Sequence, residues 1–202
     1  MISVIILAAG ESKRMGEQKL LMKWGKTSVI EHVLQVFSTS GVDEIVVMTG
    51  SHRDQIEKLI SGMKTTRPLK SIFTENFSSG EMLSSIQCGL RALQNGSADA
   101  ALIGLGDQPQ IREGTVRMVC DAFRRTKSPL VVPSFNMRRG HPWLVARELW
   151  NDLLELAPHQ TPRVFLNLHQ EKILYVDAAD ASILADLDTP SDYAKSRPTN
   201  DE

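Results

Sequence analysis

Short apolar runs alternate with amphipathic segments along the chain. The clearest apolar runs span residues 4–8, 44–49, 100–105, 130–132 and 173–176. Continuous runs of this length are typical of strands that are covered on both faces of a parallel sheet. Weaker strand signals cover residues 71–74 and 143–145. The pattern therefore predicts a sheet made mainly of parallel strands.

Segments with helical spacing of apolar residues lie between these runs. Ser28 and Glu31 have the spacing of a capping box, and Val29, Val33 and Phe37 follow at intervals of four residues. Further helices are expected over residues 55–60, 82–93, 115–123, 148–156, 162–168 and 192–195. Strands that alternate with helices predict an α/β fold, in which a doubly wound, mostly parallel, Rossmann-like sheet carries helices on both faces.

The chain is predicted to form one domain. Its 202 residues can bury a hydrophobic core, and the sequence contains no internal repeat, low-complexity tract or long linker. We assign residues 1–196 to this domain and expect residues 197–202 to be frayed.

Composition and charge narrow the class of protein. The formal net charge is −1, so the overall charge does not favour nucleic acid or an anionic membrane as a partner. The apolar N-terminus lacks the basic segment of a signal peptide, and no run approaches the ~20 apolar residues of a membrane span. Cys88 and Cys120 have no zinc-site spacing and are expected to be small buried residues. We expect a cytoplasmic protein that binds neither nucleic acid nor membrane.

Glycines and charged residues gather in four segments between the regular elements. These segments are residues 10–19, 74–85, 106–110 and 186–190. Right-handed crossovers place the loops that follow parallel strands at one carboxyl edge of the sheet, where doubly wound proteins bind their ligands. We therefore expect the four segments to meet at one site.

The first of these loops has the composition of a phosphate-binding loop. Ala8, Ala9 and Gly10 let the backbone approach a ligand closely, and the loop adds cations to a stretch of backbone N–H donors. The competing interpretation is a solvated basic turn. The kinase-type phosphate motif is absent, because Gly25-Lys26-Thr27 lacks its first glycine and a preceding strand.

The four segments together resemble a known family. LAAGESKRMG at residues 7–16 with Lys19, NFSSGEMLSS at 76–85, GDQP at 106–109 and DLDTP at 186–190 resemble the motifs of the MobA-like nucleotidyltransferases, in the same order. GDQP and Gly140-His141-Pro142 are most similar to the molybdenum cofactor cytidylyltransferase (MocA-like) branch. The chain departs from the motifs of the family at two places. Gln18 replaces a proline that many members carry, and residues 77–81 differ from the commonest sequence of the base-binding motif.

The resemblance implies roles for individual residues. It implies nucleotide binding by Leu7, Ala8, Ala9, Gly10, Lys13, Arg14, Lys19, Asn76, Gly80, Ser84 and Ser85. It implies that Lys19, Arg14 and Asp107 are catalytic, that Asp107 is the principal Mg²⁺ ligand, and that Asp186 or Asp188 gives the second metal contact. Acceptor binding is implied for Gln108, Gly140 and His141, with residues 138–168 as an elaboration that shapes the acceptor site.

Structural roles compete with several of these assignments. Asp107 can be a helix cap or a turn residue, and Asp186 or Asp188 can cap the helix that begins at Pro190. His141 can be a structural histidine after a turn. In the same way, Gly80, Ser84 and Ser85 can be a plain helix start, and Trp143 and Trp150 are expected in the core.

The implied reaction is the Mg²⁺-dependent transfer of a nucleotidyl group from an NTP, with CTP favoured, to the phosphate of a molybdopterin-type cofactor. Pyrophosphate leaves in this reaction. One alternative is a guanylyltransferase, or an NTP transferase that acts on another phosphorylated acceptor. The second is a non-catalytic protein that binds the cofactor and inserts it into a molybdoenzyme, which would make that downstream enzyme a partner. Metal ligands such as Asp107 argue against a pure binder.

Overall fold

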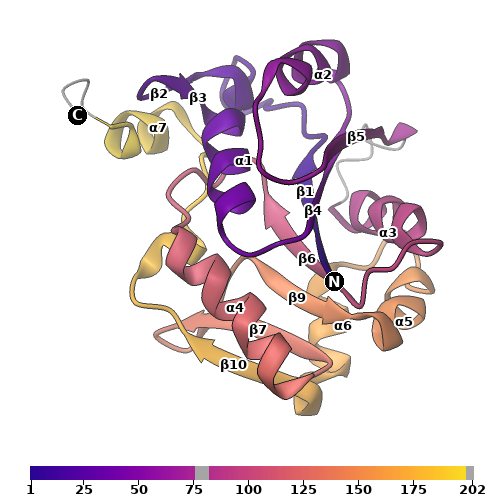
Figure 1. Cartoon of the computed structure of the whole chain (residues 1–202). Coiled ribbons are helices and arrows are strands. Elements are labelled where there is room, and N and C mark those ends of the chain that lie inside the picture. Colours follow the sequence, from indigo (N-terminus) through magenta and orange to yellow (C-terminus); the bar gives the residue numbers. More distant parts are fainter. Residues whose placement is uncertain (76–81, 199–202) are drawn as a thin grey trace.

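The computed structural model describes residues 1–75 and 82–198 (Figure 1). Its strands are β1 (Ile2–Ala8), β2 (Lys23–Trp24), β3 (Thr27–Ser28), β4 (Glu44–Thr49), β5 (Leu69–Phe73), β6 (Ala100–Leu105), β7 (Leu130–Phe135), β8 (Arg138–Arg139), β9 (Trp143–Ala146) and β10 (Ile173–Asp177). Its α-helices are α1 (Val29–Thr39), α2 (Arg53–Gly62), α3 (Met82–Leu93), α4 (Glu113–Thr126), α5 (Trp150–Leu154), α6 (Pro162–Leu168) and α7 (Pro190–Ser196). Short 3₁₀ helices include η1 (Lys19–Leu21), η3 (Arg147–Leu149), η4 (Gln170–Lys172) and η5 (Ala181–Leu184).

The predicted α/β sheet is confirmed. Its strands lie in the order β10-β7-β9-β6-β1-β4-β5, with β8 paired to β7. The strand β9 runs antiparallel to β6 and β7, and β8 runs antiparallel to β7, whereas the other pairs are parallel. A separate hairpin, β2–β3, was not predicted, because strands of two residues are too short to show a period in the sequence.

Helices cover both faces of the sheet (Figure 1). Val4 and Ile6 of β1 face a core cluster that includes residues of α1, α2 and α4, whereas Ile5 faces a second cluster built with α3, α5 and α6. Successive strand side chains point to opposite faces, so a strand that is apolar at every position fills both layers. Trp143 and Trp150 lie in the second cluster and are almost fully buried, as predicted.

The start of α1 follows the predicted capping box. The Ser28 hydroxyl accepts a hydrogen bond from the Glu31 backbone N–H, and the Glu31 carboxylate accepts one from the Ser28 N–H. The predicted helix over 148–156 is instead η3 followed by α5, which ends at Leu154. None of the helices in the described part of the chain is long and apolar enough to cross a membrane.

The order of the strands creates a crevice beside β1. From β1 the chain passes through α1 to β4 and through α2 to β5, and it then returns through α3 to β6 on the other side of β1. Crossovers therefore leave β1 and β6 in opposite directions, which opens a crevice at their carboxyl ends. The loops after Ala8 and Leu105 border this crevice.

Candidate active site

A first pocket of about 370 Å³ lies at the carboxyl ends of β1 and β6. It is lined by the loop after β1, the start of α3, the turn after β6 and the segment before α7. The predicted site residues that line it are Leu7, Ala8, Ala9, Gly10, Lys13, Arg14, Lys19, Ser85, Asp107, Asp186 and Asp188. Ser84 lies half-buried in the first turn of α3 and outside this lining, whereas Asn76 and Gly80 lie outside the described residues.

The loop after β1 is folded onto the protein by polar and apolar anchors. The Ser12 hydroxyl donates to the Gln18 side-chain carbonyl and accepts from the Lys19 backbone N–H at 3.3 Å. Met15 and Leu20 are buried. Gln18, which stands where many family members have proline, therefore closes the loop through its side chain, and Lys19 begins η1 at a defined place.

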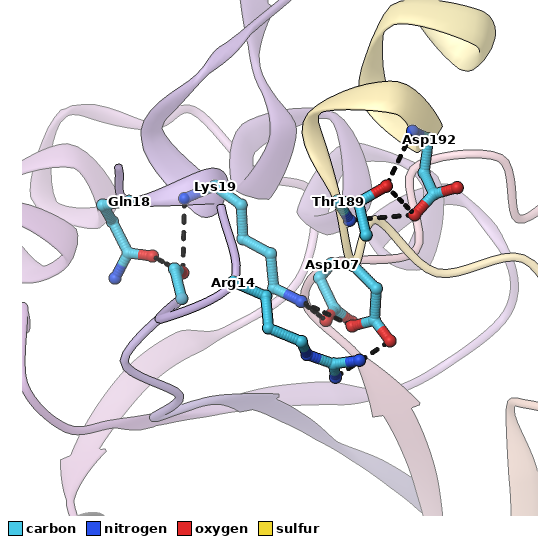
Figure 2. Close-up of polar contacts among 8 residues, drawn as sticks. Arg14, Gln18, Lys19, Asp107, Thr189 and Asp192 are labelled. Carbon is cyan, nitrogen blue, oxygen red and sulfur yellow. Dashed lines mark hydrogen bonds and ion pairs between the residues drawn. The ribbon is translucent and has the colours of Figure 1, made fainter. Parts of the chain in front are cut away.

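The cations and the carboxylates of the pocket meet directly (Figure 2). The Lys19 ammonium forms an ion pair with Asp107 and lies 3.5 Å from Oδ1 of Asp188. The Arg14 guanidinium lies 2.9 Å from Oδ2 of Asp188. Lys19 has a side chain only 13% exposed, whereas Lys13 is 77% exposed and pairs with Glu11 on the surface. The loop therefore holds one sequestered cation and is more than a solvated turn.

Leu187 brings the C-terminal carboxylates to the pocket. Its side chain is fully buried, and its backbone N–H donates to the Asp107 carbonyl at 3.0 Å. The neighbours Asp186 and Asp188 both line the pocket. Burial, followed by the charges of Asp188 and Asp107, raises the pKa of Asp186 above its usual value. The three carboxylates Asp107, Asp186 and Asp188 are therefore close enough to influence one another.

The capping roles considered for these aspartates are wrong. Helix α4 begins at Glu113 and its N-cap position is Arg112, so Asp107 is not its cap; Asp107 lies in the turn after β6, as the alternative of a turn residue predicted. At α7 the cap is Thr189, whose hydroxyl accepts from the Asp192 N–H at 3.2 Å, while the Asp192 carboxylate accepts from the Thr189 N–H at 2.8 Å (Figure 2). Asp186 and Asp188 therefore do not cap α7.

The residues present fit a divalent cation shared with a bound phosphate. Asp107 and Asp188 both lie within ion-pair distance of the same Lys19 nitrogen, so their carboxylates are close together. In the described ranges, no three His, Cys, Asp or Glu side chains form a ready metal cage. Mg²⁺ is typically held by one or two carboxylates together with substrate phosphates and water, so a full protein cage is not required.

A second, larger pocket of about 1260 Å³ adjoins the first, and Met82 lines both. Gly140 and His141 line the second pocket. Gln108 does not: its buried side-chain amide donates to the Ser182 carbonyl at 2.9 Å, which ties the turn after β6 to η5. A contact of Gln108 with an acceptor stays a prediction.

The turn at Gly140 is held against η5. The Gly140 N–H donates to the Pro133 carbonyl at 2.9 Å, and the His141 N–H donates to the Ile183 carbonyl at 3.0 Å. The Nε2 atom of His141 is buried and has no hydrogen-bond partner among the described residues. Burial lowers the pKa of His141 to about 4, so its imidazole is neutral near pH 7.

The polar residues that line the second pocket together with His141 were not singled out individually from the sequence, although residues 138–168 were predicted to shape the acceptor site. They include Arg138, Arg139, His159, Arg163, Asn167 and Tyr175. The signal available in the sequence was the Arg138-Arg139 pair directly before the Gly140-His141-Pro142 turn. Arg163 and Asn167 of α6 fall within the predicted elaboration of residues 138–168, whereas Tyr175 of β10 lies outside it.

We expect Gly140→Ala to destabilise the protein. A Cβ atom at Gly140 would lie 2.4 Å from the Ile183 carbonyl oxygen and 2.7 Å from the Ile183 Cβ, so backbone must move. Overpacking of this kind costs about 1–3 kcal/mol, which a denaturant titration of the free energy of unfolding would detect.

The matched control is Gly114→Ala in the first turn of α4, where an added Cβ meets nothing within 4 Å. This control should leave the free energy of unfolding unchanged or raise it by up to about 1 kcal/mol. Equal effects of the two substitutions would contradict the proposed clash at η5.

The fold and the pocket define the class of protein. A doubly wound sheet carries, at the carboxyl ends of β1 and β6, a close-approach loop with cations opposite a group of carboxylates. This is the arrangement of an α/β nucleotidyltransferase. The chain belongs to the MobA-like NTP transferase domain family, whose sequence profile matches residues 4–173.

Individual relatives agree with this assignment. The chain is 26% identical over 212 residues to the molybdenum cofactor cytidylyltransferase of Escherichia coli (strain K12), covering 98% of this chain and 97% of the relative. It is 46% identical over 57 residues, 28% of each chain, to a probable molybdenum cofactor guanylyltransferase of Bacillus cereus (strain AH187). A solved nucleotidyl transferase from Methanothermobacter thermautotroptrophicus superposes with a TM-score of 0.79 at 26% identity, covering 98% of this chain and 96% of the other.

Proposed function

We propose that the protein transfers a cytidylyl group from CTP to the phosphate of a molybdopterin-type cofactor, with Mg²⁺, and releases pyrophosphate. The observation that carries this proposal is the cluster of Lys19 and Arg14 with Asp107 and Asp188 at the carboxyl ends of β1 and β6. Phosphate-binding cations and metal-binding carboxylates are thereby held within one pocket.

In this reaction the residues of the chain bind the substrates and stabilise the charge that develops on the phosphates. An oxygen of the acceptor phosphate attacks the α-phosphorus, and the bond from that phosphorus to pyrophosphate breaks. The acceptor phosphate is already anionic, so no strong general base is needed. Lys19 and Arg14 turn from the carboxylates to the phosphates and neutralise the charge that develops there. Asp107 together with Asp188 or Asp186 would hold Mg²⁺, which would supply polarisation of the phosphate oxygens.

The choice of CTP and of the acceptor rests on the GDQP and Gly140-His141-Pro142 segments. It is supported by the match to the Escherichia coli cytidylyltransferase, which spans nearly the whole of both chains. The second pocket, which the Gly140–His141 turn lines, has room for an acceptor beside the nucleotide. The site would then hold the two substrates on either side of Met82.

A guanylyltransferase is the second candidate. The local similarity to the Bacillus cereus protein, at 46% identity, is higher than the overall similarity to the cytidylyltransferase. That match covers only 57 residues, so it carries less weight for the reaction as a whole. A non-catalytic insertion protein is disfavoured, because such a binder has no need of the paired carboxylates Asp107 and Asp188.

The test is pyrophosphate release with each of the four NTPs, with and without molybdopterin and with and without Mg²⁺. We expect release that depends on both, and a kcat/KM for CTP at least tenfold above that for GTP, which corresponds to about 1.4 kcal/mol. A preference for GTP would assign the chain to the guanylyltransferase branch. Absence of release with every NTP would contradict the enzymatic proposal with this acceptor.

A further inference from the structure

The second pocket carries an excess of positive charge. Arg138, Arg139 and Arg163 line it, and Asp177 is the carboxylate among its lining residues. The neutral imidazole of His141 does not change this balance. A ligand that fills the pocket therefore meets more positive than negative charge.

Arg139 differs from its neighbours because three elements hold it in place. It belongs to β8, its Nε–H donates to the Tyr175 hydroxyl of β10 at 2.8 Å, and an Nη1–H donates to the Asn167 side-chain carbonyl of α6 at 2.7 Å. Its guanidinium carbon lies 5.7 Å from the centre of the Tyr175 ring. The orientation of this guanidinium is set before any ligand arrives.

The partners of Arg139 fix its position without neutralising its charge. A phenol and an amide are both uncharged acceptors, and no carboxylate of the described ranges lies within ion-pair distance of Arg139. By contrast, Arg14, Arg53 and Arg112 are each paired with a carboxylate. An arginine has five N–H donors in a fixed plane, so after two hydrogen bonds Arg139 keeps donors and a full charge for a ligand.

We propose, on the basis of the proposed function, that the acceptor carries a second anionic group besides its reacting phosphate, and that Arg139 binds this group. Met82 borders both pockets, so a molecule whose phosphate reaches Asp107 extends into the second pocket. Arg139 then determines specificity, because an acceptor without that group leaves the positive charge of Arg139 without a partner. Asn167 and Tyr175 are positioning residues that hold the guanidinium.

The first test is steady-state kinetics with molybdopterin as the acceptor. Arg139→Gln should raise the KM for molybdopterin at least about tenfold, as expected for loss of a charge-assisted hydrogen bond, and should leave the KM for CTP within about twofold. Tyr175→Phe removes one positioning contact and keeps the charge, so a smaller rise in the same KM is expected. Arg125→Gln, on exposed α4 and outside both pockets, is the matched control.

The second test does not depend on the identity of the acceptor. With the first pocket saturated by Mg²⁺ and a non-hydrolysable CTP analogue, sulfate should raise the Tm of the wild-type protein and of Arg125→Gln above a chloride control of equal ionic strength. Arg139→Gln should lose this increment. If molybdopterin is not used but the sulfate response is lost in Arg139→Gln, the proposed acceptor is wrong and the anion site stands. If Arg139→Gln keeps both the sulfate response and the wild-type KM for molybdopterin, the inference is overturned.

Discussion

Replacing Asp107 with asparagine should lower the rate of pyrophosphate release by at least about 10², because several kcal/mol of metal-borne stabilisation depend on that carboxylate. In the proposed reaction the Asp107 carboxylate, at the carboxyl end of β6, would face the triphosphate, and the two would repel each other unless a cation lay between them. Asparagine has the same shape but no negative charge. The substitution therefore removes the electrostatic role of Asp107 and keeps its volume.

The fold should survive this substitution. The contact that ties the C-terminal segment to the turn uses the Asp107 backbone carbonyl, which accepts from the Leu187 N–H and is unchanged in the variant. Lys19 keeps Asp188 as a neighbour at 3.5 Å. We therefore expect the Tm to fall by no more than a few degrees, which corresponds to about 1 kcal/mol or less.

The measurement pairs pyrophosphate release with thermal unfolding of the same preparation. Asp121→Asn is the matched control, because Asp121 is an exposed aspartate of α4 that also pairs with a cation, Arg124, and lies outside the pocket lining. The control should keep wild-type activity. Retained activity in Asp107→Asn, or a large fall in Tm with activity that follows the folded fraction, would falsify the catalytic role.

Lys19→Ala should reduce kcat/KM by roughly 10²–10³, or about 2–4 kcal/mol. The Lys19 ammonium is largely shielded from water and lies between two carboxylates of the site. A cation that is shielded in this way interacts with a phosphate more strongly than an exposed one does. In the proposed reaction, loss of the Lys19 charge would also leave the negative charges of Asp107 and Asp188 less neutralised beside the triphosphate.

Lys13→Ala is the control for this prediction, because Lys13 belongs to the same loop and lines the same pocket but is mostly exposed. Its ammonium pairs with Glu11 at 2.6 Å on the surface. We expect a much smaller loss than for Lys19→Ala, since water screens exposed charges. Equal and small losses for the two variants would mean that the charges of this loop do not stabilise the reacting phosphates.

The sequence by itself determined the class of fold and the position of the candidate site along the chain. The apolar runs at residues 4–8 and 100–105 form strands of a sheet that is covered on both faces. Because both faces are buried, consecutive residues of these strands are apolar, and this pattern is visible in the sequence. The capping box at Ser28 is equally local, since its two partners stand three residues apart. Structure that depends only on residues close together in the sequence can be predicted without knowledge of the rest of the chain.

The motifs also located the pocket, because the carboxyl ends of parallel strands meet at one edge. Lys19, Asp107 and Asp188 were each singled out from the sequence, but their contacts were not. Lys19 and Asp188 are separated by 169 positions along the chain. Their meeting depends on the burial of Leu187 and on its hydrogen bond to the Asp107 carbonyl.

Only the tertiary structure decided which side chains share the second pocket and which aspartates have a structural task. Arg139, Asn167 and Tyr175 come from β8, α6 and β10, and nothing in their local sequence links them. Thr189 caps α7 because its own carboxylate partner, Asp192, lies at the right position, which leaves Asp188 for Lys19 and Arg14. The physical reason is that the pattern of apolar residues in the sequence indicates whether a residue is buried. Which residues a side chain contacts depends on how elements distant in the sequence pack together.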